Sequence, residues 1–266
     1  MKDYTWGITT SVNSAGEQME AAQELAQRWH VAYVPRGRQN LIDLRIAHDL
    51  DYLVTLDRKM RVCVEEPIAL HWHPSMAIPR LRQLARGGTD TFLRAADLAP
   101  GDKVIDCTLG FGADALLAAL AVGDGGVVLG IEASPIIALL TEYGLRVEAA
   151  SFASGNKPMD AISSRITVHA GESLAFLRTQ ADASWELVYF DPMFRAVNPR
   201  ASDMGSIRPL ACDLPVDADL LAEAFRVCRK RVVLKERWFS PLFERLGADH
   251  VVRTKYGPVA FGIWEK

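Results

Sequence analysis

The pattern of apolar and polar residues changes character near residue 100. From Lys103 onward, short apolar runs alternate with stretches in which apolar residues recur at helical spacing. The runs occupy residues 104–105, 127–131, 166–169, 187–190 and 232–234. Short, near-continuous apolar runs are typical of parallel strands that helices cover on both faces. The pattern therefore predicts an α/β domain over residues 101–266.

The end of the chain follows a different pattern. Residues 250–254 and 259–264 flank the turn sequence Lys255-Tyr256-Gly257-Pro258. Two strand-like runs on either side of such a turn predict an antiparallel hairpin. A parallel sheet that ends in an antiparallel hairpin resembles the Rossmann-like sheet of class I methyltransferases.

The first hundred residues predict two smaller parts. Residues 1–66 have the pattern of a small α/β domain, in which Ser14-Ala15-Gly16-Glu17 has the spacing of a capping box. The predicted strands span 6–10, 31–34 and 52–56, and the predicted helices run to Trp29 and from Asn40 or Leu41. Residues 67–100 predict a helical connector with helices over 76–86 and 89–98.

Composition narrows the class of protein. The chain has 266 residues, 49% of them hydrophobic, which is enough for a large core and a smaller one. The net charge of −3 gives no global field that would attract nucleic acid, so such contacts must come from local patches. The four cysteines form no CxxC pair, which argues against a zinc site or a disulfide framework. We find no apolar run of about 18 residues and no signal peptide, and we expect a cytoplasmic protein without membrane contact.

A glycine turn follows the first strand of the large domain. The sequence Asp106-Cys107-Thr108-Leu109-Gly110-Phe111-Gly112-Ala113-Asp114 reads as a strand end, a turn and a helix start. Glycines at this point let the backbone approach a ligand, and ligands of open α/β sheets lie at the carboxyl ends of strands. Ala115 stands where the dinucleotide fingerprint has its third glycine or alanine, so the spacing alone does not exclude NAD.

Acidic residues at three strand ends favour another cofactor. Asp106 precedes the glycines, where it would repel a pyrophosphate but suit the amino group of S-adenosylmethionine (SAM). Glu132 ends the second run, where a carboxylate accepts both ribose hydroxyls, and Glu172-Ser173 follows the third, within reach of an adenine amino group. Each acid by itself could also be a solvated residue of a first helical turn. Their recurrence at three strand ends favours SAM over NAD.

A fourth strand end carries the candidate acceptor site. Trp185 to Phe190 runs into Asp191-Pro192-Met193-Phe194. An exocyclic amine of a base is a poor nucleophile that needs to be positioned. Asp191 can accept one N–H, the Pro192 carbonyl can accept the other because proline fixes the backbone, and Phe194 can stack on the base. The other reading of this sequence is a strand-end turn with a core phenylalanine.

These motifs resemble known families. Asp191-Pro192-Met193-Phe194 resembles motif IV of amino methyltransferases, with Met193 in place of the second proline. With Met193 at this position, the motif resembles that of the RsmJ family, which methylates a guanine N2 in small-subunit ribosomal RNA. The resemblance extends over residues 67–266. The similar segments are His73-Pro74-Ser75-Met76-Ala77, residues 106–114, Glu132-Ala133-Ser134-Pro135, His169-Ala170-Gly171-Glu172-Ser173-Leu174, residues 214–221 and Lys230-Arg231-Val232-Val233-Leu234-Lys235. Ala113 and Ala133 replace arginines of that family, and residues 35–66 differ from it.

The resemblance implies a set of site residues and a partner. By the resemblance, the SAM pocket is lined by Ala113, Asp114, Glu132, Ala133, Glu172, Ser173 and Asp191. From the strand end and the glycine turn we also expect SAM to contact Asp106, Thr108, Gly110 and Gly112. The implied catalytic residues are Asp191, Pro192 and Phe194, and the substrate-binding residues are Met193, Phe194, Arg195 and Lys235. The partner would be RNA, with ribosomal RNA or the small ribosomal subunit favoured.

Several alternatives stay open at this point. Within methyltransferases, a DNA adenine or a protein amide would also suit an Asp-Pro-x-Phe motif. A non-catalytic SAM-binding or RNA-scaffolding module and an NAD-dependent oxidoreductase are alternatives from other classes. His71 and His73 lack a third ligand, so no metal is expected.

Overall fold

The chain folds into two compact units. The computed structural model describes residues 4–65, 68–154, 157–192, 209–212, 215–255 and 257–266. The smaller unit is built on the described residues up to Trp72, and the larger unit contains those from His73 onward, apart from 209 and 210. Within the described ranges, no helix is both long and apolar enough to cross a bilayer.

A five-stranded sheet forms the frame of the smaller unit. Its strand order is β2-β1-β3-β4-β5. The elements are β1 (Trp6–Thr10), α1 (Gly16–Arg28), β2 (Ala32–Tyr33), α2 (Leu41–Ala47), β3 (Tyr52–Leu56), β4 (Met60–Glu65) and β5 (Ile68–His71). β1 pairs in parallel with β2 and β3, whereas β4 pairs antiparallel with β3 and β5. The α/β character predicted for this region is therefore present, with an additional hairpin.

Two local predictions for the smaller unit are wrong. The predicted capping box does not form, because Ala15 is the N-cap of α1 and no side chain caps that helix. The Ser14 hydroxyl instead donates to the carbonyl of Ser11, 3.1 Å away. The start of the predicted helical connector is β5, which adds a strand to the sheet. Serine readily bonds to nearby backbone in turns, and this competes with capping.

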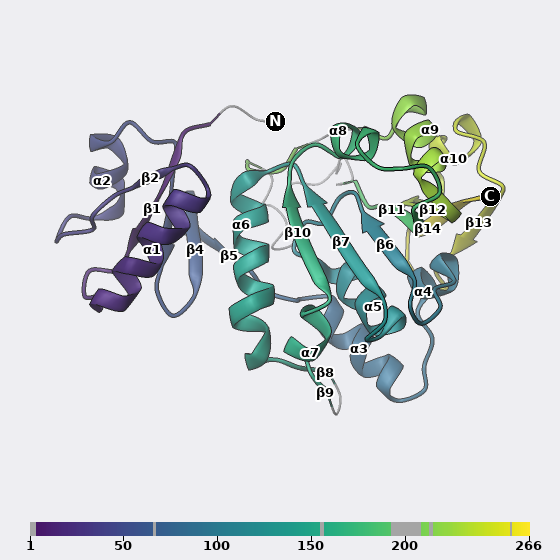
Figure 1. Cartoon of the computed structure of the whole chain (residues 1–266), viewed down its shortest axis with the longest axis horizontal. Helices are drawn as coiled ribbons and strands as arrows, with labels where there is room; N and C mark the ends of the chain where they lie inside the picture. The colour runs from purple at the N-terminus through teal and green to yellow at the C-terminus, as the bar shows by residue number, and fades with distance from the viewer. Residues whose placement is uncertain (1–3, 66–67, 155–156, 193–208, 213–214, 256) are drawn as a thin grey trace. The chain divides into compact units, whose positions relative to one another are not determined.

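The larger unit is a seven-stranded sheet between two layers of helices (Figure 1). Its strand order is β10-β7-β6-β11-β12-β14-β13. The bounds are β6 (Lys103–Asp106), β7 (Val127–Glu132), β10 (Ile166–Ala170), β11 (Trp185–Phe190), β12 (Cys228–Arg237), β13 (His250–Arg253) and β14 (Val259–Glu265). The first five strands of that order are parallel, and β14 is antiparallel to both β12 and β13. The predicted Rossmann-like sheet with a C-terminal antiparallel hairpin is confirmed.

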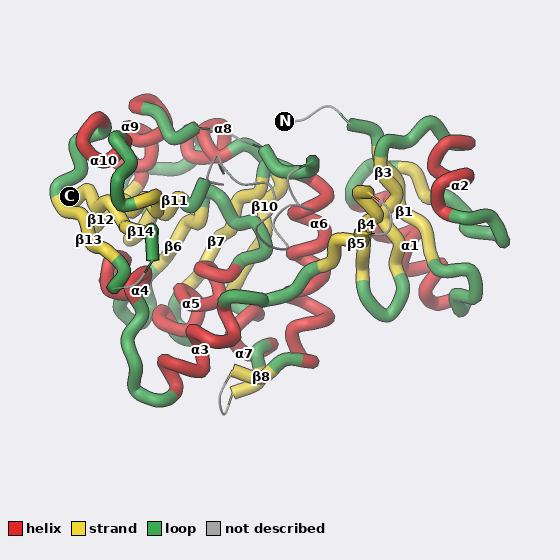
Figure 2. The backbone as a smooth tube through the Cα atoms, turned by 180° about the vertical axis from the view of Figure 1, so that it is seen from behind, coloured by secondary structure: helices red, strands yellow, loops and turns green. Residues whose placement is uncertain are grey.

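Helices connect the strands and cover both faces of this sheet (Figure 2). Their bounds are α3 (Ala77–Ala85), α4 (Thr91–Ala96), α5 (Ala113–Val122), α6 (Pro135–Tyr143), α7 (Asp160–Ser163), α8 (Ser173–Arg178), α9 (Ala218–Val227) and α10 (Leu242–Arg245). A π-helical turn (Gly144–Glu148), a 3-10 turn (Ala149–Ser151) and the short pair β8 (Ala153–Ser154) and β9 (Lys157–Pro158) complete the unit. Asp90, Ser134 and Asp217 cap α4, α6 and α9 through their side chains.

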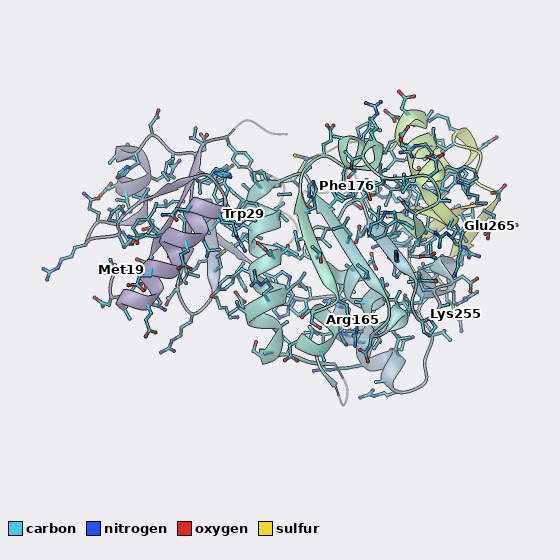
Figure 3. All side chains as sticks on the ribbon, in the orientation of Figure 1. Met19, Trp29, Arg165, Phe176, Lys255 and Glu265 are labelled. Carbon is cyan, nitrogen blue, oxygen red and sulfur yellow. The ribbon has the colours of Figure 1, made fainter. Side chains whose placement is uncertain are left out.

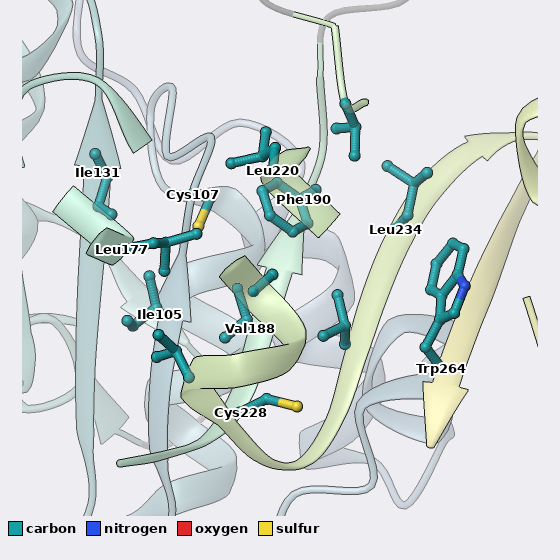
Figure 4. Packing of buried hydrophobic residues seen from close by; sticks show 14 of the residues in the cluster. Ile105, Cys107, Ile131, Leu177, Val188, Phe190, Leu220, Cys228, Leu234 and Trp264 are labelled. Carbon is teal, nitrogen blue, oxygen red and sulfur yellow. The ribbon is translucent and has the colours of Figure 1, made fainter. Parts of the chain in front are cut away.

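The alternation of side chains along β11 separates two cores. Val188 and Phe190 point into a cluster that includes Leu177 of α8 and Leu220 of α9 (Figure 4). Tyr189 points to the other face. There its ring lies against Phe92 of α4, with ring centroids 4.6 Å apart. The central strands β6 and β11 are thus buried on both faces, as their apolar runs predict, whereas β10 at the edge of the sheet is largely exposed. Side chains fill the space between the sheet and its helices (Figure 3).

Candidate functional site

The site lies at the carboxyl edge of the seven-stranded sheet. β6 is flanked by β7 on one side and β11 on the other, so the chain leaves the centre of the sheet in both directions. This arrangement is the topological switch point at which open α/β sheets bind ligands. The end residues Asp106, Glu132 and Phe190 belong to β6, β7 and β11. The parallel pairing brings these ends to one edge, as the sequence predicts.

The loop from Cys107 to Gly112 leads from the end of β6 into α5 at this edge. Gly110 and Gly112 have φ angles of 52° and 76°, a region that strongly favours glycine. A Cβ atom built on Gly110 would meet no atom within 4 Å, so its backbone faces open space. The carbonyl of Gly110 accepts a hydrogen bond of 2.7 Å from the Thr141 hydroxyl of α6. The loop is therefore fixed in a conformation that leaves its backbone open to a ligand.

Glu132 holds the loop from the neighbouring strand. Its carboxylate accepts one hydrogen bond from the backbone N–H of Gly110, at 2.9 Å, and one from Ser134, at 2.8 Å. Burial raises the pKa of Glu132, and the backbone donors oppose that shift. The acidic side chain is thus fixed in place at the end of β7, and its contact with a ribose stays a prediction.

Asp106 is a buried acid with a strongly altered pKa. Its side chain is 3% exposed, and one carboxylate oxygen accepts a hydrogen bond of 3.0 Å from the Thr108 N–H. Burial raises the pKa of Asp106 to about 8, against the effect of that hydrogen bond. A cation placed beside this carboxyl group would favour its ionised form. A ligand with an ammonium group therefore fits the position.

The end of β11 is attached to the same loop. The Thr108 hydroxyl accepts a hydrogen bond of 2.5 Å from the backbone N–H of Asp191. The Asp191 side chain is 28% exposed, and Pro192 is half-buried. Met193, Phe194 and Arg195 lie outside the described residues. The structure thus brings Asp191 and Thr108, both predicted site residues, into direct contact.

Lys235 of β12 connects two carboxylates of the site. Its Nζ lies 2.6 Å from an oxygen of Asp191 and 3.0 Å from an oxygen of Asp114 in the first turn of α5. Burial raises the pKa of Asp191 to about 6, and the charge of Lys235 limits that rise. Burial alone would lower the pKa of Lys235, but the two carboxylates outweigh it, so the ammonium group stays charged. The two negative charges are therefore held together by one cation.

Asp114 is surrounded by further donors. The Tyr189 hydroxyl donates to it at 2.8 Å, and Arg80 of α3 donates at 2.5 Å while also forming a bidentate pair with Asp90. Burial tends to raise the pKa of Asp114, but Lys235 and Arg80 outweigh it and hold the pKa well below its ordinary value. Asp114 is thus a buried anion whose hydrogen bonds to protein atoms tie α3, α5, β11 and β12 together.

The other predicted cofactor residues are spread around the loop. The Ser173 hydroxyl, at the start of α8, donates to the Cys107 carbonyl at 2.5 Å, which brings α8 to the loop. Glu172 is the N-cap of α8 and its side chain is exposed. Ala113 begins α5 and Ala133 follows β7, and both are half-buried. Their contacts with a cofactor stay predictions.

Sequence reasoning missed three members of this network. The sequence alone predicts no role in the site for Arg80, Asp90 or Tyr189. Arg80 is separated from Asp114 by 34 positions, and Tyr189 by 75, so no spacing rule connects them. One signal was available: Tyr189 interrupts an apolar strand with a hydroxyl group, which needs a partner when buried. No group of three metal-ligating side chains occurs among the described residues.

Comparison with known proteins agrees with the geometry of the site. The sequence model of the family described as "Putative SAM-dependent methyltransferase" matches residues 24–259. The protein YpiP of Bacillus subtilis, described as uncharacterized, is 33% identical over 96% of this chain and 98% of its own length. "Ribosomal RNA small subunit methyltransferase J" of Pseudomonas syringae pv. tomato is 32% identical over 170 residues, which are 61% of this chain and 60% of that protein.

A solved structure supports the fold. The crystal structure of a SAM-dependent methyltransferase from Neisseria gonorrhoeae superposes with a TM-score of 0.60 at 20% identity, covering 97% of this chain and 95% of that one. At that identity the likeness concerns the fold alone. The family model covers most of the sequence, and its cofactor suits the acidic, glycine-lined sheet edge. The chain belongs to the SAM-dependent methyltransferase family, and SAM is its cofactor.

Proposed function

We propose that this methyltransferase transfers a methyl group from SAM to an exocyclic amine of a base in RNA. The favoured acceptor is a guanine N2 of small-subunit ribosomal RNA. The observation that carries the proposal is the position of Asp191 and Pro192, which follow β11 directly beside the glycine loop. The relatives named ribosomal RNA small subunit methyltransferase J support the choice of acceptor.

The proposed acceptor site consists of two fixed hydrogen-bond acceptors. The Asp191 carboxylate accepts one N–H of the amine and the Pro192 carbonyl accepts the other. Proline restricts the backbone, and the Thr108 hydroxyl holds the N–H of Asp191, so both acceptors are positioned before the substrate binds. Phe194 and Met193 would pack on the base, and Arg195 would contact the RNA backbone. The amine nitrogen is thereby aimed at the methyl group.

The proposed cofactor site uses the other strand ends. Asp106 meets the ammonium group of SAM, and Glu132 accepts the ribose hydroxyls. Glu172 and Ser173 lie on the adenine side, and Thr108, Gly110, Gly112, Ala113 and Ala133 line the pocket with their backbone and small side chains. Asp114 supports the pocket from α5 through Lys235, because its own oxygens are taken by protein donors.

The charge of Asp191 has a clear part in the proposed reaction. SAM supplies a methyl group on a sulfonium sulfur; as the new N–C bond forms and the C–S bond breaks, positive charge moves to the amine. The amine must then lose one proton. With a pKa of about 6, the Asp191 carboxylate is ionised at neutral pH, so it stabilises the developing charge and accepts that proton. Through its hydrogen bond to Asp191, Lys235 keeps the carboxylate oriented toward the acceptor site.

The test is the variant Asp191→Asn, which keeps the size of the side chain and removes its charge. Methyl transfer to small ribosomal subunits from cells that lack the gene is expected to fall at least about 100-fold, while the affinity for SAM changes little. Asp182→Asn is the control, because this exposed carboxylate pairs with Arg226 away from the carboxyl edge. Retained turnover in Asp191→Asn would remove the assignment. Product mapping to DNA adenine or to a protein amide would move the acceptor to another class.

A further inference from the structure

A cluster of aromatic and cationic side chains lies at the end of β12 and of the neighbouring hairpin strand β13. We call Arg237, Trp238, Phe239 and Arg253 the edge cluster. Trp238 is 46% exposed and Phe239 is 58% exposed. Of the large apolar side chains that are exposed in the described ranges, these two are the only aromatic ones. Two neighbouring exposed rings on an otherwise well-buried domain point to a binding surface.

The members of the edge cluster are ordered against one another. The Trp238 and Phe239 rings stand edge to face, with centroids 5.5 Å apart. The guanidinium carbon of Arg253 lies 4.0 Å from the centre of the Trp238 ring, and that of Arg237 lies 5.9 Å from the centre of the Phe239 ring. A planar guanidinium stacked on an indole extends the flat surface that a base can cover. The cluster therefore offers stacking faces and positive charge together.

Sheet pairing fixes the edge cluster in space. Arg237 pairs with Val259 across β12 and β14, and Arg253 pairs with Ala260 across β13 and β14. The backbone N–H of Trp238 donates to the Pro258 carbonyl at 2.8 Å. Two chain segments are thus joined at one edge, so the rings and the arginines need little ordering when a partner binds.

The edge cluster is close to the proposed acceptor site. Lys235, which contacts Asp191, lies two residues before Arg237 on the same strand. Alternating side chains place Lys235 and Arg237 on one face of the sheet, at a spacing of about 7 Å. Phe239 follows two residues further on. A nucleic-acid strand whose base enters the Asp191–Pro192 corner therefore passes the edge cluster within about two nucleotides.

The edge cluster carries local positive charge. The chain as a whole is acidic, with a net charge of −3. The edge cluster contributes two arginines, and the exposed Lys255 lies in the adjoining hairpin turn (Figure 3). The acid beside them, Glu236, accepts a hydrogen bond of 2.6 Å from the backbone N–H of Arg237. Cations interleaved with aromatic rings match phosphates interleaved with bases.

We propose that the edge cluster binds single-stranded RNA beside the target nucleotide. One base stacks on Phe239 and another on the Trp238–Arg253 pair, while Arg237 and Arg253 contact phosphates. This inference rests on the proposed function, because it takes RNA as the substrate. A protein partner is the competing occupant, since exposed tryptophan and arginine also anchor protein interfaces.

Binding of RNA to the full chain tests the inference. The probe is a fluorescent 12-nucleotide RNA of mixed sequence, titrated without SAM and followed by anisotropy. Loss of one stacked base is worth about 5- to 150-fold in affinity, so Trp238→Ala and Phe239→Ala are each expected to weaken binding by at least about fivefold. Trp238→Tyr keeps a ring and is expected to bind within about twofold of the wild type. Arg253→Gln is expected to lower the slope of log affinity against log salt by about 0.7.

Two controls separate the surface from the rest of the protein. Arg146→Ala removes an exposed arginine that follows α6, a helix that runs away from the carboxyl edge, and is expected to leave RNA binding unchanged. Val251→Ala truncates an exposed side chain of the same hairpin that carries neither a ring nor a charge, and is also expected to leave RNA binding unchanged. SAM affinity and melting temperature should match the wild type in every variant, since no residue of the edge cluster has a place in the proposed cofactor pocket.

Each outcome decides the inference. Weakened RNA binding confined to the ring and arginine variants supports it. Equal binding in wild type, Trp238→Ala and Phe239→Ala overturns it and leaves the proposed function in place. Absence of RNA binding by the wild type also overturns it. So does a ribosomal protein that binds without RNA and loses this binding in Trp238→Ala. Failure of the proposed function is read separately, from methyl transfer in the Asp191→Asn experiment.

Discussion

Replacing Lys235 by glutamine removes a positive charge that lies 2.6 Å from the Asp191 carboxylate. Glutamine retains a hydrogen-bond donor, so the change isolates the charge. Asp114 keeps Tyr189 and Arg80 as hydrogen-bond donors, so its buried charge stays paired in the variant. We expect the pKa of Asp191 to rise, because burial then acts on this carboxyl group without its nearest cation.

The size of the shift follows from the distance. Even with the dielectric constant of water, two unit charges 2.6 Å apart attract each other by about 1.6 kcal/mol. A difference of about 1.4 kcal/mol corresponds to one pH unit. The side chains are only 20% and 28% exposed, so the effective attraction is at least this large. The pKa of Asp191, about 6 in the wild type, should therefore move to about 7 or higher.

The assay is single-turnover methyl transfer at saturating SAM between pH 5 and 9. Saturation removes effects of pH on cofactor binding, such as the ionisation of Asp106. The wild type should lose activity as the pH falls through about 6, because the ionised carboxylate is the active form. In Lys235→Gln the same loss should occur through about 7, so the variant should differ most from the wild type at pH 7 and below and should reach the wild-type rate as the pH rises towards 9.

The control is Lys230→Gln on the same strand. Lys230 forms an ion pair with Asp102 at 2.7 Å, at the opposite end of β12 from the site. This variant should keep the acid limb near pH 6. An acid limb in Lys235→Gln within 0.3 of the wild type, or one that moves to lower pH, would refute the reasoning about the site charges.

Two further predictions concern the cofactor side. Because the pKa of Asp106 lies near 8 in the folded protein and near 4 in an unfolded chain, the stability that this group contributes declines as the pH rises from about 4 to 8. Asp106→Asn lacks this decline, so its melting temperature relative to the wild type should rise by at least about 2 °C between pH 5 and 8.5; a constant difference would contradict this. Glu132→Gln leaves only one oxygen for the N–H groups of Gly110 and Ser134, and calorimetric affinity for SAM should fall at least about tenfold, whereas an unchanged affinity would exclude Glu132 as the ribose acceptor.

Much of the fold could be predicted from the sequence because its signals are local. The apolar runs of the parallel strands and the turn at Lys255 each report a single element, and the hairpin of β13 and β14 was correctly placed. The strand β4 was missed although Met60 and Val62 alternate with polar residues. The strand β5 was missed because helical spacing dominates the pattern of residues 67–100. Local patterns thus identify elements more reliably than they identify the sheet to which an element belongs.

The site residues also differ in whether a local pattern identifies them. Asp106, Glu132 and Asp191 each follow an apolar run, so the sequence alone placed them at one edge. The partners of Asp114 could not be found in this way, because Arg80 reaches it from a helix outside the parallel sheet. Lys235 was expected to face the substrate, and its two carboxylate partners depend on how β12 aligns with β11.

The anchoring of the glycine loop has an energetic consequence. Ordering a backbone residue costs about 1–2 kcal/mol of conformational entropy. If the loop were disordered in the free protein, this cost would reduce the free energy of cofactor binding. Here Glu132, Thr141 and Ser173 already hold residues 107–110 through hydrogen bonds. The ordering occurs when the chain folds, so in the proposed site SAM would meet a loop that is already hydrogen-bonded in place and would retain more of the free energy of its contacts as affinity.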